Sequence, residues 1–372
     1  MIDQQSLSGP WLDQKQKESK KDPTIIEKMI WALYLLEQLQ LSGLPFMFKG
    51  GTCLVLMMDK PLRFSVDIDI IIDPSITKEE LEFYLQTVVE QSAFERVELD
   101  ERRSYKGVIP KAHYNFFFIS NYQNKSKEGQ VIKNPEKEVL LDVLFEKTHY
   151  PATQTCSIKS DWLITQPPFV GVTTPDINSI TGDKLTAFAP DTIGVPYKKE
   201  KEKEIMKQLF DLGVLFNLVD DLQLLKQSFF AMAKNEIGYR AEGQKMEPQD
   251  VLMDIINTAL ILNRANKQLN AEDAEKFEEL NTGIDQFRHY VFVGNFRMEN
   301  ALLAASKAAY LAATIFKDNV GPIKRFDPEL SKEDYMIKNQ QYNFLNKKLK
   351  FIAKGEALFY WNETINLIAP GE

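Results

Sequence analysis

The spacing of apolar residues along the first half of the chain predicts alternating helices and strands. Asp22-Pro23 has the composition of a helix start, and apolar residues then recur every three or four positions as far as Leu39. A short buried helix over 53–58 and a helix over 77–91, capped by Ser75 or Thr77, are also expected. Segments rich in β-branched and aromatic residues predict strands over 45–48, 66–72, 96–99, 113–119 and 139–145, with a polar loop over 121–138. This order predicts an α+β domain in which helices flank a mixed sheet.

The pattern changes after Pro167-Pro168 and Pro175, where apolar spacing becomes helical almost throughout. Helices are expected over 176–189, 200–218, 221–234, 248–265, 271–281, 297–316, 331–348 and 350–359. The first residues are polar and are expected to be loosely ordered. The sequence therefore predicts a flexible N-terminus over 1–21, an α/β domain over 22–170 and an all-helical C-terminal domain over 171–372.

Composition and charge narrow the class of protein. Hydrophobic residues make up 44% and charged residues 26%, which is ordinary for a globular protein, and no apolar run approaches the roughly 18 residues that span a bilayer. No signal peptide is visible and two cysteines form no disulfide framework, so a cytoplasmic protein without a membrane partner is expected. Three scattered histidines argue against a zinc enzyme, and each is more typical of a structural or surface residue.

Two aspartates on one predicted strand are the first candidates for chemistry. Side chains alternate along a strand, so Asp67 and Asp69 share one face while Ile68 and Ile70 point to the other. Two neighbouring carboxylates repel each other unless a cation lies between them, and magnesium prefers such oxygen ligands. An isolated Asp-x-Asp is also typical of a solvated strand edge, so the surrounding residues decide between these interpretations.

Two further features favour a phosphate and metal site. Gly50-Gly51-Thr52 follows a predicted strand and opens a helix, where glycines admit an anion close to exposed N–H groups. Asp142 interrupts the otherwise apolar strand over 139–145, and a carboxylate in that setting is costly unless it is hydrogen-bonded or bound to metal. A turn that holds a triphosphate beside carboxylates that hold metal forms one coherent site.

These residues carry a resemblance to a known family. Lys49-Gly50-Gly51-Thr52 followed by Arg63-Phe64-Ser65-Val66-Asp67-Ile68-Asp69 resembles the first motif of the AbiEii/AbiGii nucleotidyltransferase toxins, which belong to the polymerase β-like nucleotidyltransferase superfamily. The later strand with a single acidic residue matches at Asp142, although the gap from Thr52 to Asp67 is long for the superfamily.

Two downstream segments extend the resemblance to about residues 25–216. The segment 180–188 is similar to the family's Glu-Lys-Leu-x-Ala-Leu helix and retains Lys184, with Asp183 in place of the glutamate. The segment 207–215 is similar to its Arg-Asp-Leu-x-Asp-Leu helix and retains Asp211, but Gln208 stands where the family often has aspartate.

The resemblance implies a polymerase β-like fold and a nucleotidyltransferase that moves a nucleoside monophosphate from an NTP to an acceptor hydroxyl. It implies two Mg²⁺ ions on Asp67, Asp69 and Asp142, with Lys184 and Asp211 as further catalytic residues. Nucleotide would contact Lys184 and the residues Lys49, Gly50, Gly51, Thr52, Arg63 and Ser65. Bracing of the aspartate strand is an equally good interpretation of Arg63, and Asp211 could either orient Lys184 or act as a base.

The acceptor and the partners are expectations from the same resemblance. It implies the toxin of an abortive-infection or toxin–antitoxin pair, with tRNA as acceptor and a cognate antitoxin as partner. A small-molecule acceptor such as an aminoglycoside, a protein acceptor, and a non-catalytic binding module of this fold remain alternatives. The net charge of -8 argues against a broadly basic surface, so any RNA contact would need a local patch, either at lysines within 198–207 or at lysines within 347–354 beside Phe351.

Overall fold

The computed structural model describes residues 1–58, 60–122, 124–125, 131–132, 135–240, 245–264, 269–292 and 294–369. The chain divides into two compact units. Unit 1 comprises residues 1–148 and 153–175, and unit 2 comprises residues 149–152 and 176–372. The predicted domain boundary at 170–171 therefore lies inside unit 1, directly before its last strand.

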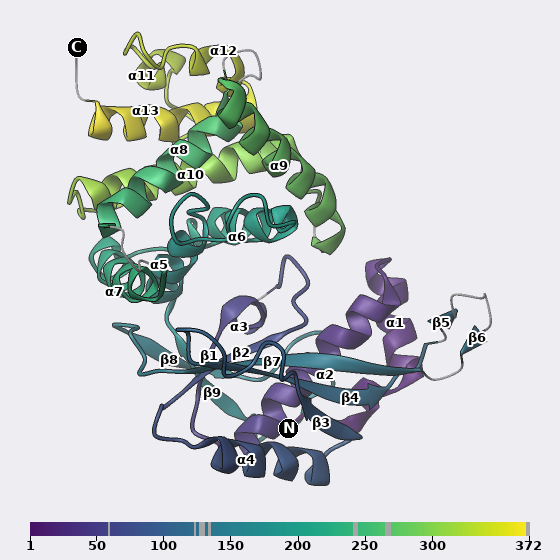
Figure 1. The fold of residues 1–372 in the computed structure, drawn as a ribbon. Coiled ribbons are helices and arrows are strands. Elements are labelled where there is room, and N and C mark those ends of the chain that lie inside the picture. The colour runs from purple at the N-terminus through teal and green to yellow at the C-terminus, as the bar shows by residue number, and fades with distance from the viewer. Residues whose placement is uncertain are drawn as a thin grey trace. The chain divides into compact units, whose positions relative to one another are not determined.

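A five-stranded mixed sheet forms the centre of unit 1 (Figure 1). Its order is β1 (Met47–Lys49), β2 (Ile68–Ile72), β7 (Glu136–Phe145), β4 (Lys111–Ile119) and β3 (Arg96–Leu99). β2 and β7 are parallel, and the other neighbouring pairs are antiparallel. The structure thus confirms the five predicted strands and the α+β class, and no strand end differs from the prediction by more than three residues.

Three helices pack against the two faces of the sheet. α2 (Pro23–Leu41) packs against β2, β7 and α4 (Lys78–Gln91), and α3 (Gly50–Met57) packs against β1 and β2. Figure 1 shows α4 and α3 on opposite sides of the sheet. The start of α4 follows the predicted cap: Thr77 and Glu80 form a capping box, each side chain accepting the other residue's main-chain N–H.

The N-terminal segment contains helices that the sequence pattern did not predict. Residues Gln4–Leu7 form the 3₁₀ helix η1 and Gly9–Ser19 form α1, with Leu12 fully buried. The buried Glu37 carboxylate accepts the main-chain N–H of Ile2 at 2.8 Å and 3.1 Å. This segment is mostly polar, so its few apolar residues gave no helical pattern in the sequence. They become buried only through contacts with residues distant in sequence.

The sequence also missed a second, smaller sheet. β8 (Thr153–Ser157) and β9 (Gly171–Pro175) pair antiparallel, and their mixed polar composition lacks the alternation that indicates a strand. The predicted loop over 121–138 contains the short pair β5 (Asn124–Lys125) and β6 (Val131–Ile132) and the start of β7, and its other residues lie partly outside the described ones.

Unit 2 is helical, as predicted. Its helices are α5 (Ile177–Ala187), α6 (Glu202–Leu215), α7 (Leu222–Arg240), α8 (Pro248–Asn263), α9 (Ala271–Phe287), α10 (Met298–Phe316), α11 (Lys332–Tyr335), α12 (Leu345–Leu349) and α13 (Glu356–Ile368), with short 3₁₀ turns η3 (Arg288–Tyr290) and η4 (Ile352–Gly355). The expected helix over 331–348 is broken into α11 and α12, and that over 350–359 begins only at Glu356.

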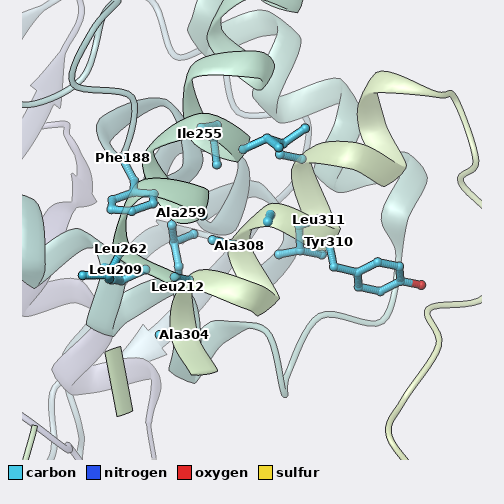
Figure 2. Close-up of a cluster of buried hydrophobic side chains, with 14 of the residues drawn as sticks. Phe188, Leu209, Leu212, Ile255, Ala259, Leu262, Ala304, Ala308, Tyr310 and Leu311 are labelled. Atoms are coloured by element: carbon cyan, nitrogen blue, oxygen red, sulfur yellow. The ribbon is translucent and has the colours of Figure 1, made fainter. Parts of the chain in front are cut away.

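The core of unit 2 lies between α6, α8 and α10 (Figure 2). Helical spacing directs one stripe of each helix inward: Leu209 and Leu212 from α6, Ile255, Ala259 and Leu262 from α8, and Ala304, Ala308 and Leu311 from α10. The small alanines let α10 approach its neighbours closely. No helix in the described part of the chain is long and apolar enough to cross a membrane.

Candidate active site

The turn between β1 and α3 brings the predicted phosphate-binding residues against the predicted carboxylates. Gly50 adopts a φ of +81°, which favours glycine, and a Cβ at this position would overlap the Asp69 carboxylate. A Cβ at Gly51 would lie 2.7 Å from both Arg63 Nη2 and Ser65 Oγ. The positive φ and the close approach of Asp69 favour glycine at position 50, and a side chain at position 51 would displace the Arg63 and Ser65 side chains that surround the turn.

Two polar side chains of the predicted nucleotide site brace the backbone. Thr52 is fully buried, and its hydroxyl donates to the main-chain carbonyl of Asp67 at 2.5 Å. Arg63 is buried, and its Nη1 donates to the carbonyl of Phe64 at 2.8 Å. The Thr52 hydroxyl thus holds the segment before β2 in place, which leaves the backbone of the turn as the part of this motif suited to phosphate.

The aspartates meet through the parallel pairing of β2 and β7. Asp69 lies opposite Asp142 in register, and the flanking pair Ile68 and Leu141 is fully buried. Paired residues of neighbouring strands point to the same face, so both carboxylates lie on the face opposite that apolar layer. Asp67 directly precedes β2 and is half-buried, and Lys49 lies opposite Asp69 on the other neighbouring strand.

His113 is a site residue that the sequence analysis missed. It lies opposite Asp142 in the antiparallel pairing of β4 and β7, and its Nδ1 contacts Asp142 Oδ1. The histidine side chain is only 4% exposed, whereas that of Asp142 is 32% exposed. An alignment of the predicted strands 113–119 and 139–145 could have suggested the pair, but register is decided by tertiary pairing.

The donor set suits magnesium better than a softer metal. In the described residues no group of three or more histidine, cysteine or acidic side chains is arranged to hold a metal ion. Magnesium needs only one or two protein carboxylates, because water and substrate phosphates complete its coordination. Asp69 and Asp142, side by side next to the Gly-Gly turn, fit that requirement.

Lys184 and Asp211 belong to unit 2 and form a buried pair. Lys184 on α5 lies 3.0 Å from the Asp211 carboxylate on α6, and the side chains are 8% and 2% exposed. Lys184 Nζ also donates to Gln208 Oε1 at 3.0 Å. Glutamine at position 208 therefore keeps an acceptor for the lysine without adding a second negative charge.

The mixed sheet places a glycine turn beside aspartates on adjacent parallel strands, and the comparison with known families identifies the class of protein. The family model described as the nucleotidyl transferase AbiEii toxin of type IV toxin–antitoxin systems matches residues 33–291. Because this match spans more than half of the 372 residues, the chain belongs to that family and is a nucleotidyl transferase. No curated protein matches the chain.

Proposed function

We propose that the protein transfers a nucleoside monophosphate from a nucleoside triphosphate to an acceptor hydroxyl, with magnesium, as the toxin of a toxin–antitoxin pair. The observation that carries this proposal is the register pairing of Asp69 with Asp142 beside a turn that places Gly50 against Asp69. Two neighbouring carboxylates on one face of a sheet repel each other, and a bound cation would remove that repulsion.

The chain's own groups divide the work of the reaction. Main-chain N–H groups at Gly51 and Thr52 would hold triphosphate oxygens, and Arg63 and Ser65 line the same turn. Asp67, Asp69 and Asp142 would hold two magnesium ions, which neutralise phosphate charge and lower the pKa of the acceptor hydroxyl. The acceptor hydroxyl would give up its proton to water and its oxygen would form a bond to the α-phosphorus, while the bond from the α-phosphorus to the bridging oxygen breaks and pyrophosphate leaves with that electron pair.

Lys184 keeps in the proposal the nucleotide-contacting role that the family resemblance implies. Within unit 2 its Nζ lies 3.0 Å from the buried Asp211 carboxylate, which compensates the positive charge. Asp211 then acts by orienting the lysine, which is the alternative that the ion pair supports.

For the acceptor we propose the 3′ end of an RNA, with tRNA as the first candidate and a cognate antitoxin as the regulating partner. The support is the family's description as a type IV toxin, together with a basic surface described below. A small-molecule or protein acceptor is the competing outcome of the experiment.

The test is incubation of the protein with magnesium, each α-³²P-labelled nucleoside triphosphate and total RNA, followed by a denaturing gel. We expect one labelled band of tRNA size that is absent with Asp67→Asn. The matched control is Asp73→Asn, which removes the same charge from an exposed residue just after β2 and should label normally. Labelling that survives Asp67→Asn contradicts the mechanism, and nucleotide turnover without labelled RNA would redirect the acceptor to small molecules or proteins.

A further inference from the structure

The structure separates the two lysine runs that the sequence offers as basic patches. In the first run, carboxylates pair with three of the five lysines, and glutamates alternate with the lysines in sequence. Lys198 lies 3.1 Å from Glu275, and Lys203 and Lys207 lie 3.6 Å and 2.6 Å from Glu204. This run therefore presents little net positive charge to a ligand.

The second run has no such compensation. Five lysines and no acidic residue occur between Tyr335 and Gly355, although the whole chain carries a net charge of -8. Lys347, Lys348 and Lys354 are exposed, and within the described residues none of the lysines of 347–354 forms an ion pair. We call the segment 347–354 the lysine corner.

An exposed aromatic ring lies within the lysine corner. Phe351 is 72% exposed, and Lys350 Nζ lies 5.0 Å from the centre of its ring. Leu345, Leu349 and Ile352 are buried and fix the segment to the core of unit 2. Exposure of an apolar ring to water is unfavourable, and a ligand that stacks on the ring would remove that apolar surface from water.

The backbone at the corner is strained. Ala353 and Lys354 adopt φ values of 47° and 57°, which non-glycine residues rarely adopt. This conformation turns the chain sharply after Phe351 and keeps Lys354 at the surface. Strain of this kind persists where surrounding structure maintains it, often at binding sites.

We propose that the lysine corner binds a single-stranded stretch of RNA, with the lysines on phosphates and Phe351 stacked on a base. Lysines that track a backbone beside an aromatic platform are the combination that binds single strands without sequence preference. A negatively charged membrane is the competing ligand for lysines beside an exposed aromatic ring, and vesicle binding is therefore one outcome of the test. The inference rests on the proposed function, because it supplies that function with a contact for its RNA acceptor.

The experiment measures binding of a fluorescein-labelled single-stranded RNA 12-mer by anisotropy at several salt concentrations, without nucleotide. It uses full-length protein carrying Asp67→Asn, so that transfer cannot alter the RNA. The test variants are Lys347→Gln/Lys348→Gln and Phe351→Ala. Their matched controls are Lys198→Gln/Lys199→Gln in the neutralised run and Phe83→Ala, since Phe83 is 71% exposed on α4.

We expect Lys347→Gln/Lys348→Gln to weaken binding about tenfold and to flatten the log–log salt dependence by roughly 1.4, which corresponds to two phosphate contacts. Phe351→Ala should weaken binding by roughly 5- to 100-fold with little change in the salt slope. Both controls should bind like the parent protein. Circular dichroism of every variant excludes unfolding as the cause.

Equal losses in test and control variants, or no loss in the test variants, would overturn the proposal. Binding of the corner to phosphatidylserine vesicles but not to RNA would also overturn it and assign the surface to membranes. The outcome is separable from the proposed function. If the parent protein labels RNA but the lysine-corner variants bind RNA as tightly as their controls, only the proposed RNA site at the lysine corner is refuted. If the lysine-corner variants lose RNA binding but the parent protein labels no RNA, only the proposed nucleotidyl transfer to RNA is refuted.

Discussion

The pair of His113 and Asp142 allows a sharp test of how the carboxylate site is built. Asp142 Oδ1 contacts a histidine that is almost fully buried, while about a third of the aspartate side chain remains exposed. The histidine thus fixes one oxygen and leaves Oδ2 outside this contact. If Asp142 holds a metal ion, His113 is a positioning residue that acts through it.

Replacing His113 with leucine removes the contact while keeping an apolar side chain of moderate size. Partners that orient metal ligands typically contribute 10- to 100-fold in metal affinity, so Mn²⁺ binding should weaken by about that factor. The lost hydrogen bond to a charged group should also lower the free energy of unfolding by about 1.5–3 kcal/mol. Transfer should fall at low metal concentration and recover at high concentration.

The assay is Mn²⁺ titration by electron paramagnetic resonance, paired with urea unfolding. His113→Asn keeps an N–H donor near the Nδ1 position and should retain Mn²⁺ affinity within a few-fold. His149→Leu, at an exposed histidine, controls for loss of a histidine as such. A folded His113→Leu protein with unchanged Mn²⁺ affinity would refute the positioning role, because a purely structural histidine would lower stability alone.

Four further outcomes follow from the structure. Gly51→Ala should reduce transfer at least tenfold and raise the apparent KM for nucleotide, because the added Cβ would lie 2.7 Å from Arg63 Nη2; unchanged kinetics would show that the turn does not contact nucleotide. Asp211→Asn should lower stability by roughly 3–5 kcal/mol in urea unfolding, because Lys184 remains buried without its counter-charge, and Lys184→Ala should reduce transfer about 10²-fold. Burial raises the pKa of Asp254 to about 6, so the folded state binds its proton more tightly than the unfolded state. Stability should therefore rise as pH falls through about 6 towards the unfolded-state pKa near 4, by on the order of 1 kcal/mol between pH 7 and 5, and this rise should be absent in Asp254→Asn.

Local chemistry made the main elements and several site residues predictable from sequence. The five strands of the central sheet are predictable because their β-branched and aromatic runs are short and bounded by turn residues. Gly50, Gly51, Asp67 and Asp69 stand close together in sequence, so the Gly-Gly-Thr turn and the Asp-x-Asp pattern indicated a site before any packing was known.

Segments whose stability comes from distant partners were not predictable in the same way. α1 has a polar composition, yet its buried Leu12 anchors it, and β8 and β9 lack the alternation that marks a strand. The continuous helix expected over 331–348 is divided, because Ile337 and Leu345 are buried while the residues between them form turns.

The sequence by itself determined the fold class, the family and the residue types of the site, because these depend on spacing within short segments. Only the tertiary structure decided which distant residues meet. Parallel pairing places Asp142 opposite Asp69, antiparallel pairing adds His113, and helix packing buries Lys184 against Asp211. It also decided which lysines meet a distant carboxylate: the pair of Lys198 with Glu275 depends on the folded arrangement of the helices, whereas the pair of Lys207 with Glu204 lies within one helix.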